Sequence, residues 1–186
     1  MEDEKIIELY WQRDEEALKQ TNEKYGAFCY CIAQNILKNA EDSKECVNDT
    51  WFKTWLVIPP KRPEFFQAFL GKITRNLSLD RYRKSRASKR GAGCMDVIYE
   101  ELEECIASRE TPDGQTDAIV ITDALARFLS GISRDARVIF VRRYWYADSV
   151  ARIADRYSMS ESKVKSSLMR SRNKLKAFLE KEGISV

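Results

Sequence analysis

Four acidic or amide side chains recur on one side of a helix predicted to begin near residue 43: Asp42, Glu45, Asn48 and Asp49. Their spacing of three, six and seven positions places them on the same helical face. Carboxylates so arranged can hold a metal, but carboxylate-bridged helical sites also use Glu-x-x-His pairs, and the chain has no histidine. A solvated face is the commoner explanation of acidic helical residues, and an acidic patch that docks a basic partner is a third possibility. The pattern alone leaves these alternatives open.

Charge is distributed in blocks along the chain. Residues 1–49 hold 12 acidic and 6 basic side chains, and residues 96–117 hold 8 acidic side chains against one arginine. Residues 72–90 hold 8 basic side chains against one aspartate, and residues 133–176 hold 12 against 4. Like charges at helical spacing repel, so a merely solvated face explains such density poorly. Two basic blocks between acidic ones indicate a protein that contacts a polyanion at two places.

Aromatic side chains lie beside the first basic block: Trp51, Trp55, Phe65, Phe66, Phe69 and Tyr82. Aromatic faces next to Lys and Arg suit single-stranded nucleic acid, because bases stack on rings while phosphates pair with cations. Trp and Phe at helical spacing are more often core residues, so most of these are expected to be buried. The proline-rich bend at residues 58–65 is the part expected to meet a flipped base.

The second basic block contains the proportions of a helix-turn-helix. A short helix is expected over residues 149–157, a break at residues 158–160, and a long helix from Glu161 that is capped by Ser160. The side chains expected to reach base edges or phosphates are Ser160, Ser162, Lys163, Lys165 and Ser166, with Arg170 and Arg172 on phosphates. An ordinary helical hairpin is the alternative, and the surrounding positive charge favours DNA binding.

The elements that position these residues are all predicted to be helices. Apolar residues recur at helical spacing from Tyr25 to Leu37, from about residue 43 to the prolines at 59 and 60, and from about Glu64 to Lys84. The pattern returns from Ala118 to Gly131 and from Arg134 to about Trp145. The acidic, glycine-containing stretch between the two halves reads as a flexible linker with a short helix near residues 98–106. We therefore predict an all-α chain: a domain at residues 1–87, a linker at 88–116 and a domain at 117–186.

Composition excludes several classes of protein. Without histidine there is no His-based triad or usual zinc-hydrolase site. Five cysteines without a Cys-x-x-Cys pair are expected to be reduced and mostly small core residues. No apolar run is long enough for a membrane span, and the acidic residues 1–5 do not resemble a signal peptide. A cytoplasmic protein without cofactor or metal is expected.

Several stretches resemble the bacterial RNA polymerase sigma factors of the extracytoplasmic-function (ECF) type. Residues 42–55, DSKECVNDTWFKTW, resemble that family's polymerase-binding helix, and residues 69–84, FLGKITRNLSLDRYRK, resemble its promoter-melting helix. Residues 149–154, SVARIA, and 164–172, VKSSLMRSR, resemble its C-terminal helix-turn-helix. Asn48 stands where the family usually has glutamine, Lys163 where it often has threonine and Ser167 where it often has arginine. The resemblance covers residues 15–88 and 117–180.

The resemblance implies a sigma factor, which is not an enzyme. It would bind core RNA polymerase, on the β and β′ subunits, through Asp42, Glu45, Asn48 and Asp49. It would capture the promoter −10 element as a single strand with Lys61, Arg62, Phe65, Lys72, Arg75, Asn76, Asp80 and Arg83. The C-terminal domain would read the −35 element as duplex, and an anti-sigma protein would hold the factor inactive.

Two other classes remain open from the residues alone. One is a helix-turn-helix regulator that acts without polymerase, normally as a dimer on a two-fold operator. The other is a nuclease with a metal held by Asp42, Glu45 and Asp49. A regulator would leave the acidic helix and the aromatic-basic N-terminal half without a role.

Overall fold

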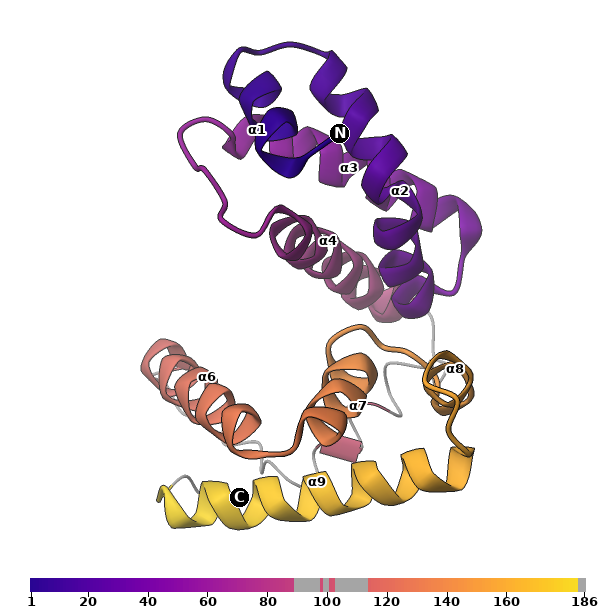
Figure 1. Cartoon of the computed structure of the whole chain (residues 1–186), viewed down its shortest axis with the longest axis vertical. Helices are drawn as coiled ribbons and strands as arrows, with labels where there is room; N and C mark the ends of the chain where they lie inside the picture. The colour runs from indigo at the N-terminus through magenta and orange to yellow at the C-terminus, as the bar shows by residue number, and fades with distance from the viewer. Residues whose placement is uncertain (89–97, 99–100, 103–113, 184–186) are drawn as a thin grey trace. The chain divides into compact units, whose positions relative to one another are not determined.

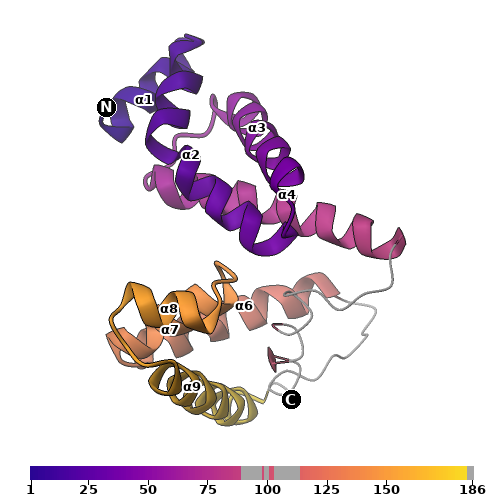
Figure 2. The ribbon, with the colours of Figure 1, turned by 90° about the vertical axis from the view of Figure 1, so that its right-hand side faces the viewer.

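The fold is all-α, as predicted. The computed structural model describes residues 1–88, 98, 101–102 and 114–183, and within these ranges it contains helices labelled α1–α4 and α6–α9. The side chains of residues 86–88 and 114–122 lie outside this description. The chain divides into two compact units, Met1–Gly91 and Ala92–Val186. Figures 1 and 2 show the helices of each unit from two directions.

The N-terminal unit is built on four helices: α1 (Asp3–Trp11), α2 (Glu16–Leu37), α3 (Ala40–Val57) and α4 (Phe66–Ser88). The long helix α2 packs against both α3 and α4 (Figure 2). The core consists of large apolar side chains from all four helices, including Ile6, Tyr10, Cys29, Trp51, Phe66 and Leu70. Helix α1 is absent from the predicted helices, although acidic residues in its first turn and the buried Ile6, Ile7 and Tyr10 are a helical signal.

The contact between α3 and α4 is polar and buried, which the apolar pattern of α4 did not predict. Thr74 and Ser78 are fully buried on α4, whereas Ile73 and Leu77, which belong to the apolar pattern predicted between Glu64 and Lys84, are only half-buried. The hydroxyls of Thr74 and Ser78 each donate to the carbonyl four residues earlier, at 2.9 and 2.7 Å. Because these hydrogen bonds satisfy the hydroxyls, small polar side chains can lie where an apolar stripe is expected.

The buried polar contact made by Thr74 and Ser78 continues with polar side chains of α3. The Thr50 hydroxyl lies 3.2 Å from that of Thr74, and the Cys46 sulfur lies 3.2 Å from the Ser78 hydroxyl. Burial raises the pKa of the Cys46 thiol, and it raises the pKa of the Cys29 thiol to about 12. Both cysteines are therefore protonated core residues at neutral pH, in agreement with the prediction for most of the cysteines.

The C-terminal unit contains α6 (Gly114–Gly131), α7 (Arg134–Tyr144), α8 (Val150–Arg156) and α9 (Glu161–Lys181). A serine caps each of the last three helices: the hydroxyls of Ser133, Ser149 and Ser160 accept from the amides of Ala136, Arg152 and Lys163. The predicted cap at Ser160 is confirmed, and one face of α9 is buried at Val164, Leu168, Ser171, Leu175 and Leu179. These caps fix where α7, α8 and α9 begin.

The predicted linker falls mostly outside the described residues, and so does most of the short helix expected near residues 98–106. Of the part that is described, Gly114 already begins α6, three residues before the predicted start of the second domain. Ile98 is buried, at 1% exposure. Glu101 is hydrogen-bonded to Arg143 and Tyr144 of α7. Part of the predicted linker therefore packs within the C-terminal unit.

Candidate nucleic-acid interface

Helix α9 presents an uncharged strip between two rows of cations. Ser162, Ser166, Met169 and Asn173 recur at intervals of four, three and four residues and are exposed. Met169, at 52% exposure, was not among the predicted site residues. One flank carries Lys163, Arg170 and Lys174, and the other carries Lys165 and Lys176, all exposed. Hydroxyl and thioether groups can contact base edges while the cations reach phosphates.

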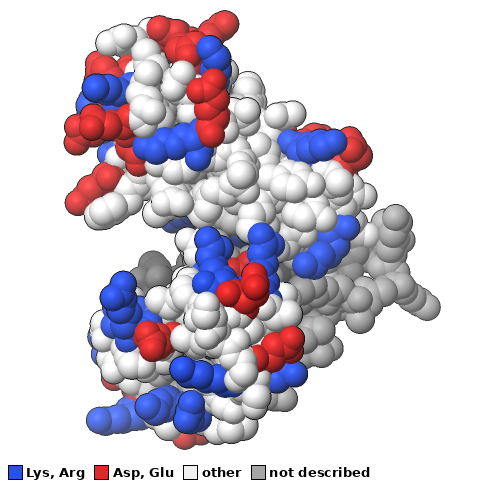
Figure 3. Space-filling view, turned by 45° about the vertical axis from the view of Figure 1, so that its right-hand side comes forward, with Lys and Arg blue, Asp and Glu red and all other residues white. Residues whose placement is uncertain are grey.

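Only one of these five cations has an ion-pair contact with a described residue. Lys165 Nζ lies 3.8 Å from a carboxylate oxygen of Glu161, one turn earlier. Both side chains are more than half exposed, so this contact contributes little. On the face drawn in Figure 3, Lys and Arg gather over the lower body, which is the C-terminal unit. The positive field of α9 is thus available to a polyanion.

Arg172 is not one of the exposed cations of α9, although the sequence predicted that it contacts phosphate. Its guanidinium donates to the hydroxyl of Tyr144 at 3.0 Å and lies 3.7 Å from Glu101. Arg143, at 5% exposure, donates to the two carboxylate oxygens of Glu101 at 2.6 and 3.2 Å and to the carbonyl of Asp148. Arg172 therefore belongs to a polar network that ties α9 to α7, because its position on the helix turns it towards α7.

The charges of this network stabilise one another. Burial by itself would raise the pKa of Glu101, but hydrogen bonds from Arg143 and Tyr144 and the charge of Arg172 hold it below its usual value. Burial raises the pKa of Tyr144 to about 12, so its hydroxyl remains a hydrogen-bond donor. Glu101 is accordingly a carboxylate at neutral pH, held by two arginines.

In the N-terminal unit, one exposed face of α4 continues from the preceding loop. Phe65 (69% exposed), Lys72, Asn76 and Arg83 follow one another at helical spacing, with Asp80 at its edge. Arg83 lies 3.5 Å from Asp80, and Arg75 is half-buried beside the face. Trp51 and Phe66 are buried in the core, as expected, whereas Trp55, Phe69 and Tyr82 are only half-buried. Phe65 is the large aromatic side chain of this face that is available for stacking.

The loop before α4 is held by the first helix. Both terminal nitrogens of Arg62 lie 3.3 Å from a carboxylate oxygen of Glu8, and the guanidinium lies over Trp11, 6.0 Å from the ring centroid. The Arg13 guanidinium donates to the carbonyl of Trp55 at 2.6 Å and lies over its ring. Lys61 is exposed. Of the two predicted cations of this loop, Arg62 is thus already engaged by its own unit.

The acidic face of α3 is present and partly neutralised. Asp42, Glu45 and Asn48 are exposed and Asp49 is half-buried. Arg81 of α4 lies 2.8 Å from Glu45 and 2.6 Å from Asp49, and this hydrogen bond and charge lower the pKa of Glu45. The side chain of Arg81 was not among the predicted site residues. Because Arg81 lies on α4, its contact with these carboxylates could not be predicted from the spacing of residues on α3.

The acidic face continues into an apolar one. Phe52 and Leu56 lie one and two turns beyond Asn48 and are 64% and 56% exposed. Exposed apolar residues next to charged ones are typical of a protein-docking surface. The tryptophan that precedes each of them on the helix is less exposed: Trp51 is buried and Trp55 is half-buried. Together, Asp42, Glu45, Asn48, Asp49, Phe52 and Leu56 form what we call the α3 face.

The described residues contain no group of three or more cysteine or carboxylate side chains positioned to hold a metal ion. Glu45 and Asp49, which a nuclease would need as ligands, instead share Arg81. Within the described ranges, no helix is long and apolar enough to cross a membrane.

Comparison with known sequences yields two family matches. The profile of sigma-70 region 2 matches residues 23–88, and the profile described as ECF sigma factor matches residues 59–181. Among characterised proteins, the chain is similar to the ECF RNA polymerase sigma factor SigL of Mycobacterium tuberculosis, in strains Erdman, CDC 1551 and H37Rv. The identity is 24% over 170 residues, which covers 88% of this chain and 89% of SigL.

Proposed function

The chain belongs to the family of ECF sigma factors, which direct transcription initiation with RNA polymerase, and from this premise we propose how its surfaces divide that work. The α3 face binds the polymerase core, the loop at residues 58–65 and α4 capture the −10 element as single strand, and α9 reads the −35 element as duplex. No bond is made or broken, because sigma factors are not enzymes.

The observation that carries the proposal is that three exposed helical faces have three different chemistries. The α3 face is acidic and apolar, the α4 face combines an exposed phenyl ring with cations, and α9 has an uncharged strip between cationic rows. A basic protein surface, an unpaired base and a DNA major groove are the respective partners that fit these faces. A lone helix-turn-helix regulator would need only the last of them.

The α3 face suits the clamp helices of the polymerase β′ subunit. Its carboxylates would meet basic side chains, and Phe52 and Leu56 would lose their exposed apolar surface on docking. Burying apolar surface contributes about 25 cal/mol per Å², so this pair adds affinity that the charges alone do not supply. Arg81 holds the carboxylates of Glu45 and Asp49 in place through its two ion pairs.

The α4 face suits an opened promoter strand. An unpaired base can stack on Phe65, while Lys61 and Lys72 lie near enough in sequence to meet the adjacent phosphates. Capturing unpaired bases lowers the cost of melting, which is a few kcal/mol per unstacked or flipped base. The face therefore acts by preferring single strand over duplex.

On α9, the strip from Ser162 to Asn173 would face base edges in the major groove, and the cations on either side would meet the two DNA strands. A partner protein that covered these charged and apolar surfaces would keep them from polymerase and DNA. We therefore include an anti-sigma protein that occludes the α3 face or α9 among the proposed partners.

Transcription with purified core polymerase tests the proposal. The Asp42→Lys/Glu45→Lys double variant is expected to lose core binding and promoter-dependent run-off transcript by more than tenfold, since it reverses two exposed charges of the docking surface. The matched control is Glu4→Lys/Glu23→Lys, which makes the same change at exposed positions of α1 and α2.

The fold should survive in both variants, and circular dichroism checks this. If the double variant of α3 still binds core polymerase as tightly as the wild type, the α3 face is not the docking surface. If both pairs weaken binding equally, the effect is one of net charge rather than of this face.

A further inference from the structure

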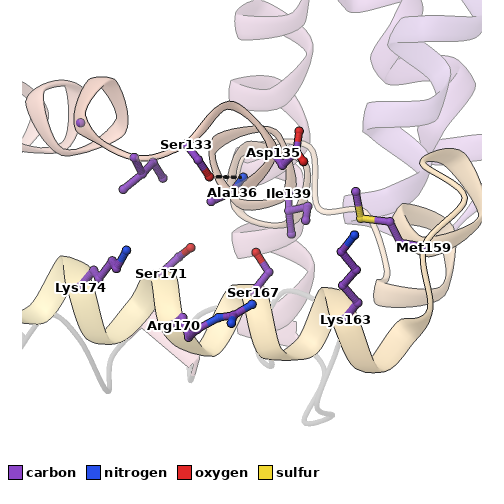
Figure 4. Close-up of a pocket in the computed structure, with 12 residues that line it drawn as sticks. Ser133, Asp135, Ala136, Ile139, Met159, Lys163, Ser167, Arg170, Ser171 and Lys174 are labelled. Carbon is purple, nitrogen blue, oxygen red and sulfur yellow. Dashed lines mark hydrogen bonds between the residues drawn. The ribbon is translucent and has the colours of Figure 1, made fainter.

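A groove runs along one flank of α9 and is closed on its other side by the start of α7. Its volume is about 360 Å³, and its walls include Lys163, Ser167, Arg170, Ser171 and Lys174 from α9. The opposite wall is formed by the turn and first residues of α7, from Gly131 to Ala136 (Figure 4). This groove lies beside the uncharged strip rather than on it, and only Lys163 and Arg170 of its residues were predicted DNA contacts.

The charge of the groove is uncompensated. Lys163, Arg170 and Lys174 recur at intervals of seven and four residues on the same flank, and none of them has an ion pair with a described residue. Three cations on one wall repel each other, so an anion between them is favoured. The one carboxylate of the groove, that of Asp135, points away from α9 in Figure 4.

The start of α7 adds backbone donors. Ser133 caps this helix of 11 residues by accepting from the Ala136 amide, which leaves the amides of Arg134 and Asp135 without a hydrogen-bond acceptor in the described part of the chain. Amides at a helix start carry partial positive charge and bind phosphate oxygens. Both walls of the groove thus favour the same kind of ligand.

Ser171 supplies an independent indication of a ligand. The residue is 4% exposed, yet its hydroxyl makes no hydrogen bond to any residue that the structure describes. In Figure 4 the hydroxyl points from α9 into the groove. Its oxygen is not among the fully buried, unpartnered side-chain atoms of the described residues, so it is open to the groove, where a ligand can reach it. A phosphate oxygen in the groove would provide a hydrogen-bond partner.

We propose that this groove is a phosphate pocket that holds one backbone phosphate of duplex DNA, with Ser171 and Lys174 as binding residues beside Lys163 and Arg170. The inference rests on the proposed role of α9 in reading duplex DNA. A helix in the major groove, about 12 Å wide, has a phosphate backbone on each side. The row of Lys163, Arg170 and Lys174 follows one backbone, while Lys165 and Lys176 face the other.

A neighbouring hollow extends the pocket. It is about 180 Å³ in volume, shares Asp135, Ile139 and Met159 with the groove, and adds the apolar side chain of Val138 and the ring of Tyr157. An apolar surface next to an anion site suits a phosphate attached to deoxyribose better than a free ion, since the sugar has apolar carbons to bury. We therefore commit to the DNA backbone as the source of the phosphate.

The test uses the full chain and a set of −35 duplexes, selected in vitro for binding, in which one phosphate at a time is replaced by neutral methylphosphonate. For the wild type, neutralising the phosphate that occupies the pocket is expected to weaken binding several-fold. In Lys174→Ala and in Ser171→Ala that penalty should shrink, because part of the contact is already lost. Lys174→Ala should also lower the slope of log affinity against log salt by about 0.9.

Lys176→Ala is the matched control, because it removes one exposed cation from the other flank of α9. It should keep the penalty at the pocket phosphate. Ser171→Ala is expected to fold, since it removes a hydroxyl that has no partner among the described residues, and its melting temperature should not fall. If both pocket variants keep the wild-type penalty at every phosphate, the pocket proposal is wrong.

One further outcome would also overturn it, and another would overturn the proposed function instead. If inorganic phosphate saturably shifts the amide resonances of the pocket while the variants bind DNA as the wild type does, the pocket serves a free phosphate compound. If Lys165→Ala leaves DNA affinity and its salt slope unchanged, while Lys174→Ala lowers both, the strip of α9 does not read DNA. That last result would refute the proposed function rather than the pocket.

Discussion

Helices α4 and α9 both carry many cations, but the two helices make different use of them. On α4 and the loop before it, Arg81 is held between Glu45 and Asp49, Arg83 lies beside Asp80, and Arg62 is held by Glu8. On α9, four of the five flanking cations have no ion-pair contact within the described residues. Although both helices carry many cations in the sequence, α9 therefore produces a stronger positive field at the surface than α4 does.

This difference matches two kinds of nucleic acid. Duplex DNA is bound chiefly through its dense phosphate charge, which rewards free cations and makes affinity depend on salt. A single strand offers bases as well, and stacking on an aromatic ring is largely independent of salt. The α9 surface fits the first mode, and Phe65 with its partly neutralised surroundings fits the second.

The sharpest way to break this comparison is to remove the ring. Phe65→Ala should slow formation of open promoter complexes by about 5- to 100-fold, since stacking of one base is worth about 1–3 kcal/mol. Fluorescence of 2-aminopurine placed in the −10 element, measured with the reconstituted holoenzyme, reports the opening. The residue is 69% exposed, so the fold should be unaffected.

Phe65→Trp is the conservative control and should keep opening near the wild-type rate, because it preserves a stacking surface. The loss in Phe65→Ala should be similar at low and high salt. A loss that disappears at high salt would mean that Phe65 acts by placing cations, and the contrast with α9 would fail.

The helical periodicity of the sequence was enough to predict most elements of the fold. Apolar residues at intervals of three and four placed α3, α7 and α8 within a few residues, and Ser160 predicted the start of α9 correctly, whereas α2 begins at Glu16, nine residues before the predicted Tyr25. Periodicity did not predict Thr74 and Ser78 as core residues, because a hydroxyl bonded to its own helix counts as polar in any pattern. A single polar residue in the sequence therefore predicted its own burial less well than a run of periodic apolar residues predicted a helix.

Site residues were predictable by type but not by pairing. Spacing correctly grouped Asp42, Glu45 and Asn48 as exposed neighbours. It could not show that Arg81 joins them or that Glu101 and Tyr144 hold Arg172, because each of these contacts joins helices far apart in the sequence. Which cation is free and which is engaged is a tertiary property, and it is the property on which the comparison of α4 with α9 depends.

Arg172 of α9 is turned away from the proposed DNA surface and is held by Glu101. Changing Glu101 therefore tests what this network of charges contributes. Glu101→Gln should lower the stability of the C-terminal unit by about 2 kcal/mol at pH 7, because Arg143 is buried and loses its counter-charge. Thermal unfolding measured between pH 3 and 7 checks this.

The pH dependence has a definite sign. The pKa of Glu101 is lowered in the folded chain, so its contribution is present at neutral pH and is lost as the pH falls below its usual value. The difference in stability between wild type and Glu101→Gln should therefore shrink towards pH 3. A constant difference across the range would show that the hydrogen bonds, rather than the charge, provide the stabilisation.

The smallest expected effect is the difference between the free Lys61 and the engaged Arg62 in the loop before α4. Lys61→Ala should lower the salt slope for binding of single-stranded −10 DNA by about 0.7, the value for one phosphate contact on a single strand. Arg62→Ala should leave that slope nearly unchanged, because Glu8 and Trp11 already hold the guanidinium. Its cost should instead appear as a loss of stability of the N-terminal unit of a few tenths of a kcal/mol, as is usual for an exposed ion pair.

Glu8→Gln frees Arg62 without removing it and should raise the slope in Lys61→Ala back towards the wild-type value. If Arg62→Ala lowers the slope as much as Lys61→Ala does, the ion pair with Glu8 opens when DNA binds, and the surface before α4 then offers the same free charge as α9.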